Sequence, residues 1–128
     1  MMFVDTVQVE IYPGTSKPWV LSRDVGLVCA KHKVDLRIGM GFDWNAANVP
    51  WVFTRLMPRS SPEFLIASLF HDYLYHHPIK GFDRERADEL FKEVLIHCGV
   101  SKWKASLAFI GVRLGGWHSY DANGGAVV

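Results

Sequence analysis

The segment from His71 to His77 carries most of the side chains in this sequence that could perform chemistry. It reads His-Asp-Tyr-Leu-Tyr-His-His and continues an apolar stretch with a helical pattern. At about 100° per residue, His71 and Tyr75 share one face of a helix, and Asp72 and His76 share the adjacent face. Ionisable groups in apolar surroundings must be paired, because desolvation otherwise destabilises them. The pattern therefore predicts a buried polar site around His71.

A second acidic residue, Asp88, lies on the next predicted helix. If the two helices pack antiparallel, Asp88 faces back toward His71. A histidine with a carboxylate on one nitrogen and a water on the other is a general base with a fixed tautomer. The same groups also fit a structural interpretation, in which Asp72 pairs with His76 on the surface and Asp88 is solvated. Both interpretations stay open from the residues alone.

The elements that must position these residues change character near residue 60. Before it, apolar and polar residues alternate, as at Val7, Val9 and Ile11, which is the period of a half-buried strand. Short connections predict an antiparallel sheet of three to four strands within residues 3–40. The further strands are expected at 19–21, 26–30 and 34–38, and an irregular loop at 39–60.

After residue 60 the pattern is helical. Ser61-Pro62-Glu63 combines a capping hydroxyl, a first-turn proline and an acid near the positive end of a helix. Three antiparallel helices are expected, at about 62–77, 84–98 and 102–117. The third carries an apolar stripe made of Trp103, Leu107, Ile110, Leu114 and Trp117. The fold class is therefore α+β, with residues 1–120 in a single domain and residues 121–128 as a loose tail.

The composition excludes several classes of protein. The chain has 128 residues, and 14 basic residues against 13 acidic ones give a net charge of +1. This balance argues against nucleic-acid binding, and no apolar run approaches the ~20 residues of a transmembrane segment. Two cysteines make no disulfide framework and fit a reducing compartment, and the first residues lack the features of a signal peptide. The sequence thus predicts a soluble protein made inside the cell.

Aromatic residues are 13% of this short chain, so some rings are expected on the surface. An exposed aromatic patch is typical of a protein partner, of self-association or of a lipid surface.

Three motifs resemble a family of small tailed-phage and prophage proteins of unknown function, whose hallmark is His-Asp-x-Leu-Tyr with a downstream Ala-Asp-x-x-Phe. They are the segments 69–75, 86–91 and 112–117. The resemblance implies a bacteriophage virion component, assembly component or accessory factor. It would bind phage structural proteins or itself, and would act in the host cytoplasm during infection or in the virion. Trp51, Trp103 and Trp117 would then form protein–protein interfaces. Upstream, the chain departs from the family's pattern, because Asn45 and Asn48 stand where the family usually has an acid and a serine.

The same helix pair is similar, more distantly, to the catalytic helices of phospholipases A2. That resemblance implies an ester hydrolase in which His71 activates water, and in which Tyr75 and Asp88 orient the imidazole. Asp72 would bind calcium, together with Asp43 and backbone carbonyls near residues 39–42, since calcium takes about six to eight oxygens. The chain departs from that family because no cysteines flank the dyad and the calcium loop has no clear counterpart. The sequence therefore leaves two functions open. One is a phage component whose polar network is structural, and the other is a hydrolase.

Overall fold

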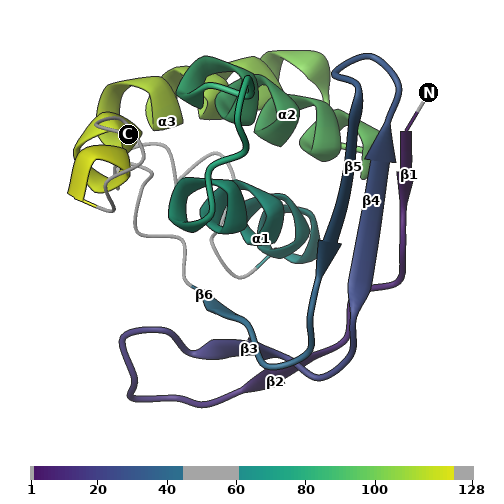
Figure 1. Ribbon diagram of the computed structural model, residues 1–128, viewed down its shortest axis with the longest axis vertical. Coiled ribbons are helices and arrows are strands. Elements are labelled where there is room, and N and C mark those ends of the chain that lie inside the picture. The colour runs from purple at the N-terminus through teal and green to yellow at the C-terminus, as the bar shows by residue number, and fades with distance from the viewer. Residues whose placement is uncertain (1, 45–60, 123–128) are drawn as a thin grey trace. The chain divides into compact units, whose positions relative to one another are not determined.

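The computed structural model describes residues 2–44 and 61–122, with the side chains of residues 115–122 excepted. It has an α+β arrangement in which strands occupy the N-terminal part and three helices follow, so the predicted fold class is confirmed (Figure 1). The chain divides into two compact units, Met1–Asn45 and Ala46–Val128, and each is described by itself. The expectation of a single domain over residues 1–120 stays a prediction.

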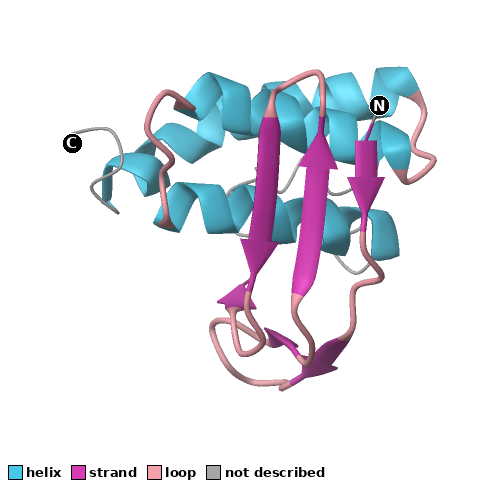
Figure 2. Cartoon of the chain, turned by 45° about the vertical axis from the view of Figure 1, so that its right-hand side comes forward, coloured by secondary structure: helices cyan, strands magenta, loops and turns pink. Residues whose placement is uncertain are grey.

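The first sheet consists of β1 (Met2–Val4), β4 (Val25–Cys29) and β5 (Val34–Ile38), in the order β1-β4-β5 (Figure 2). Its strands are all antiparallel, and Leu27 lies opposite Leu36 in the central pair. Along β5, Val34, Leu36 and Ile38 are buried, whereas the polar residues between them are exposed. This alternation is the expected result of a period of two on a sheet with one buried face.

The second sheet consists of β2 (Val9–Ile11), β3 (Trp19–Leu21) and β6 (Asp43–Trp44), in the order β2-β3-β6. Trp19 and Trp44 are cross-strand partners, and their ring centroids lie 5.9 Å apart. We expected one sheet of three to four strands, with no strand beyond residue 40. The strands instead form two sheets, because β1 and β2 pair with different partners, β4 and β3. The rest of the expected loop, residues 45–60, lies outside the described residues.

The helices begin where the capping residues predict. The N-cap of α1 (Pro62–His76) is Ser61, whose side chain accepts a hydrogen bond from the backbone N–H of Phe64. The N-cap of α2 (Arg84–His97) is Asp83, whose carboxylate accepts from the N–H of Arg86. Each cap satisfies a backbone donor that the helix itself cannot. The third helix, α3 (Lys102–Ala122), extends five residues beyond the expected end at residue 117.

The α1 and α2 helices pack against each other in opposite directions. Phe64, near the start of α1, contacts Phe91 in the second half of α2, with ring centroids 5.7 Å apart. Tyr75, at the end of α1, contacts Asp88 in the first half of α2. The α3 helix packs mainly on α2 and touches α1 at fewer points. The ends of α1 and α2 that carry ionisable residues are therefore neighbours.

The side of α3 that packs inward carries small residues. Ala105, Ala108 and Val112 are buried, whereas the larger side chains of Trp103, Ile110 and Leu114 are exposed. The apolar stripe predicted for this helix thus lies on its outer side. Within the described residues, no helix has both the length and the apolar character needed to cross a bilayer.

Candidate functional site

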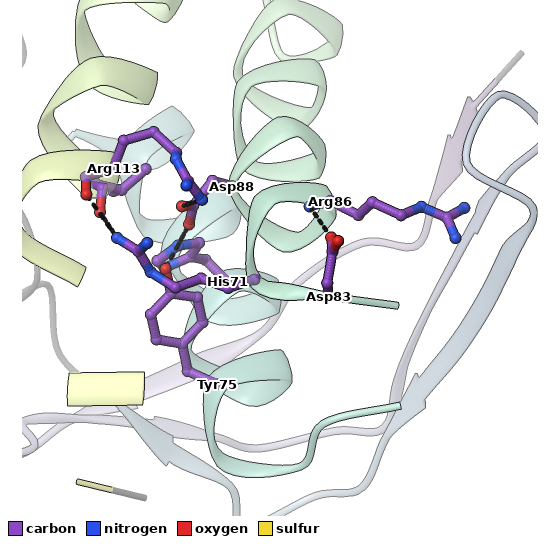
Figure 3. Close-up of polar contacts among 8 residues, drawn as sticks. His71, Tyr75, Asp83, Arg86, Asp88 and Arg113 are labelled. Atoms are coloured by element: carbon purple, nitrogen blue, oxygen red, sulfur yellow. Dashed lines mark hydrogen bonds and ion pairs between the residues drawn. The ribbon is translucent and has the colours of Figure 1, made fainter. Parts of the chain in front are cut away.

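The carboxylate of Asp88 is the centre of a buried polar network in the helical unit. Its side chain has 0% exposure, and its oxygen Oδ1 lies 2.6 Å from His71 Nε2 and 2.6 Å from the hydroxyl of Tyr75. The other oxygen, Oδ2, accepts a hydrogen bond from Arg113 Nη1 at 3.0 Å. Figure 3 shows these three side chains gathered around Asp88. One carboxylate therefore binds side chains of both neighbouring helices.

The helix geometry explains why two of these groups arrive together. His71 and Tyr75 are four residues apart on α1, so they lie on one face, with ring centroids 4.2 Å apart. The ring of Phe91 lies 5.0 Å from that of His71 and forms an apolar wall beside the pair. On α2, the Asp83 cap sets the start of the helix, and Asp88 follows just over one turn later (Figure 3). The structure thus brings His71, Tyr75 and Asp88 together, while their catalytic role stays a prediction.

Two arginines complete the network, and sequence reasoning missed both. Arg113 on α3 forms the ion pair with Asp88, and its side chain is 33% exposed. Arg84 donates from Nη2 to the backbone carbonyls of Arg113, at 2.5 Å, and Val112, at 3.3 Å. A signal for Arg113 was present, because it is the only charged residue between Lys104 and Trp117. A lone charge in an apolar helix requires a partner when it packs inward.

The protonation pattern follows from the chemistry of the partners. A carboxylate only accepts hydrogen bonds, so His71 Nε2 and the hydroxyl of Tyr75 both act as donors. Burial raises the pKa of Tyr75 strongly, and the negative charge of Asp88 raises it further. The phenol therefore remains a neutral donor at physiological pH. Within the described part of the chain, no hydrogen bond reaches the other imidazole nitrogen, His71 Nδ1.

The two predicted calcium ligands lie in different compact units, and each is described by itself. Asp72 is buried on α1, and its Oδ1 lies 3.5 Å from His76 Nε2, one turn away. Asp43 is exposed on β6, in the other compact unit. Among the described side chains, no three His, Cys, Asp or Glu residues are grouped to hold a metal ion. Two carboxylates alone do not supply the six to eight oxygens that calcium takes, and the calcium role of Asp72 and Asp43 stays a prediction.

The three tryptophans predicted at interfaces have different positions. Trp103 is 57% exposed near the start of α3. Trp117 lies in the same helix, but its side chain belongs to the part that is not described. Trp51 falls within residues 45–60 and is likewise outside the described residues. Of the three, Trp103 is the one placed on an exposed surface.

The arrangement is compatible with two kinds of chemistry. As a structural device, it neutralises a buried carboxylate and joins α1, α2 and α3 through directional hydrogen bonds. As a catalytic device, it would hold an imidazole in one tautomer, with Nδ1 directed to a water. Catalysis also requires access for substrate, and His71 is buried, with 4% of its side chain exposed.

Comparison with known proteins places the chain in a family. No curated protein and no solved structure matches the sequence significantly. The profile of a family described as "Protein of unknown function (DUF1353)" matches residues 19–112. The matched region includes His71, Tyr75 and Asp88 and covers most of the 128 residues. This chain belongs to the DUF1353 family.

Proposed function

We propose that this chain is a non-catalytic bacteriophage protein, a virion or assembly component or an accessory factor, whose His71–Asp88 network is structural. The observation that carries the proposal is that both oxygens of the buried Asp88 carboxylate accept hydrogen bonds from neighbouring helices. Its three side-chain donors come from the adjacent helices, two from α1 and one from α3. A fully buried carboxylate with three donors, one of them charged, is a stable cross-link between packed helices.

The burial of the network supports this role over catalysis. Asp88 and Tyr75 have 0% exposure, and His71 has 4%. A general base must come within hydrogen-bond distance of the proton that it removes, either directly or through one water. Buried side chains that substrate does not reach are better suited to stabilising the packing of the helices than to catalysis.

The phage setting rests on the resemblance of the segments 69–75 and 86–91 to small tailed-phage proteins. The surface of α3 adds support, because Trp103, Ile110 and Leu114 are exposed on it. Exposed aromatic and large aliphatic side chains in one patch are typical of protein–protein interfaces. A component that acts by assembly needs such a surface more than it needs an open cleft.

The test compares two substitutions of His71. His71→Gln keeps an N–H donor for Asp88 but has no basic nitrogen, whereas His71→Ala removes both. If the network is structural, the glutamine variant retains most of the stability that the alanine variant loses, as measured by urea unfolding. A phage carrying His71→Gln then yields wild-type numbers of particles. Reduced yield from a His71→Gln protein that is as stable as wild type would contradict the proposal.

A hydrolase is the second candidate, and it is favoured by one observation. His71 Nε2 is held on a carboxylate while its Nδ1 has no hydrogen bond within the described residues, which is how an oriented general base is arranged. Release of p-nitrophenol from p-nitrophenyl esters, and of fatty acid from phospholipid micelles, would measure this activity. Turnover by the wild-type protein that is lost in His71→Gln would establish the hydrolase and refute the structural proposal.

A further inference from the structure

The outer side of α3 carries a regular apolar stripe that no described residue covers. The stripe consists of four apolar residues at successive steps of four, three and four positions: Trp103, Leu107, Ile110 and Leu114. Trp103 is 57% exposed, Ile110 45% and Leu114 65%, and Leu107 is partly exposed. Alternating steps of three and four are the seam of a two-helix coiled coil, in which each apolar side chain fits between residues of the facing helix.

The stripe lies opposite the side on which α3 packs. At about 100° per residue, its four members fall within roughly 60° of one another, and Ala105, Ala108 and Val112 lie on the far side of the helix. The latter three are buried. The stripe is therefore additional to the packing of the helical unit, and α3 has two apolar sides.

The residues beside the stripe are neutral or basic. In heptad terms the flanking positions are Lys104 and Gly111 on one side, and Ser106 and Arg113 on the other. The segment 101–114 contains Lys102, Lys104 and Arg113 but no Asp or Glu. Lys104 Nζ lies 5.6 Å from the centre of the Trp103 ring, so a positive charge stands directly at the edge of the stripe.

We propose that this stripe binds an amphipathic helix of a partner protein that carries acidic residues beside its own apolar seam. The inference rests on the proposed function and names the partner's chemistry. A glutamate at the flanking position of the partner meets Lys104, which stands at the edge of the stripe, and such pairs select partners and orientation in coiled coils. A second copy of this chain would place neutral or basic flanks against each other, so its charges do not complement those of α3.

The test uses the full-length protein and a fluorescent synthetic helical peptide of about three heptads, with Leu at both seam positions and Glu at both flanking positions. A matched peptide carries Lys instead of Glu. We expect fluorescence anisotropy to show binding of the acidic peptide at least about tenfold tighter than that of the basic peptide. Lys104→Glu in the protein should reduce this preference, because it reverses one flanking charge.

Ile110→Glu places a charge in the stripe and should weaken binding of the acidic peptide at least about tenfold. Its matched control is Ile79→Glu, at another exposed isoleucine of the same compact unit, which is 39% exposed. Circular dichroism verifies that both variants are folded. Equal binding of the two peptides, or equal binding by wild type and Ile110→Glu, would overturn the inference.

Two further results would show that the stripe binds a second copy of this chain or a lipid surface, and either would overturn the inference. One is a dimer in light scattering that Ile110→Glu converts to a monomer. The other is binding to phosphatidylglycerol vesicles, abolished by Ile110→Glu, without binding of the acidic peptide. Failure of the proposed function is distinguishable, because ester hydrolysis lost in His71→Gln would refute that function while peptide binding at α3 stayed intact.

Discussion

Replacing Asp88 with asparagine is the most direct perturbation of the buried network. The substitution keeps the size and shape of the side chain and removes its charge. The remaining amide oxygen can still accept from His71 and Tyr75, but the amide nitrogen then faces the donor Nη1 of Arg113, which lies 3.0 Å from Oδ2 in the native protein. Two donors cannot satisfy each other, so the ion pair is lost and replaced by an unfavourable contact.

The magnitude follows from the contacts that are lost. A hydrogen bond to a charged group contributes about 1.5–3 kcal/mol, and breaking a buried ion pair by removing one partner costs about 3–5 kcal/mol. Arg113 is 33% exposed, so water can hydrate it after the change, which places the effect at the lower end. We expect Asp88→Asn to reduce the free energy of unfolding by about 3 kcal/mol.

The measurement is urea unfolding followed by circular dichroism at the helical minimum. Glu89→Gln is the matched control, because it makes the same chemical change at the next residue, which is only partly buried, and should alter stability by less than about 0.5 kcal/mol. If Asp88→Asn is no more destabilising than Glu89→Gln, the network does not hold the helices together.

A double substitution tests whether Asp88 and Arg113 act as a pair. In Asp88→Asn with Arg113→Met, the unpaired guanidinium is absent, so the combined loss should be smaller than the sum of the two single losses by about 1 kcal/mol or more. Simple additivity in the same urea experiment would show that the two residues are not coupled.

Two other predictions concern the pH dependence of stability at Tyr75 and the close contact between Gly26 and the side chain of Asp5. Because burial and Asp88 raise the pKa of Tyr75, the folded protein retains the phenolic proton above pH ~10, where the unfolded chain releases it. This contribution to stability is complete below pH ~10 and is lost as the pH rises. The urea midpoint of Tyr75→Phe should therefore fall less steeply above that pH than the midpoint of the wild-type protein. Parallel plots of midpoint against pH for the two proteins would contradict this prediction. At Gly26, an added Cβ would lie 3.1 Å from Asp5 Oδ2, which accepts a hydrogen bond from the Gly26 N–H. Gly26→Ala should therefore reduce stability by about 1–2 kcal/mol, and an unchanged urea midpoint would refute the close approach.

Local features of the sequence predicted the elements well. The caps at Ser61 and Asp83 act through hydrogen bonds within three residues of themselves, so short-range patterns suffice to place the starts of α1 and α2. The alternation along 34–38 likewise predicted β5, with its exposed and buried sides. The nearness of His71 and Asp88 was one of two interpretations that the sequence left open, and it depended on the antiparallel packing that a short connection favours.

The tertiary structure alone decided which partners these elements take. The division of the strands into two sheets could not be predicted from the sequence, because the pairings of β1 with β4 and of β2 with β3 depend on hydrogen bonds between different strands. It also did not show that α3 packs by its small residues, because a helix with two apolar sides has no single inward direction in the sequence. That choice brings Arg113 to Asp88 and leaves Trp103 exposed. The physical reason is that close helix contact favours small side chains at the interface, a preference that acts only once the neighbouring helix is in place.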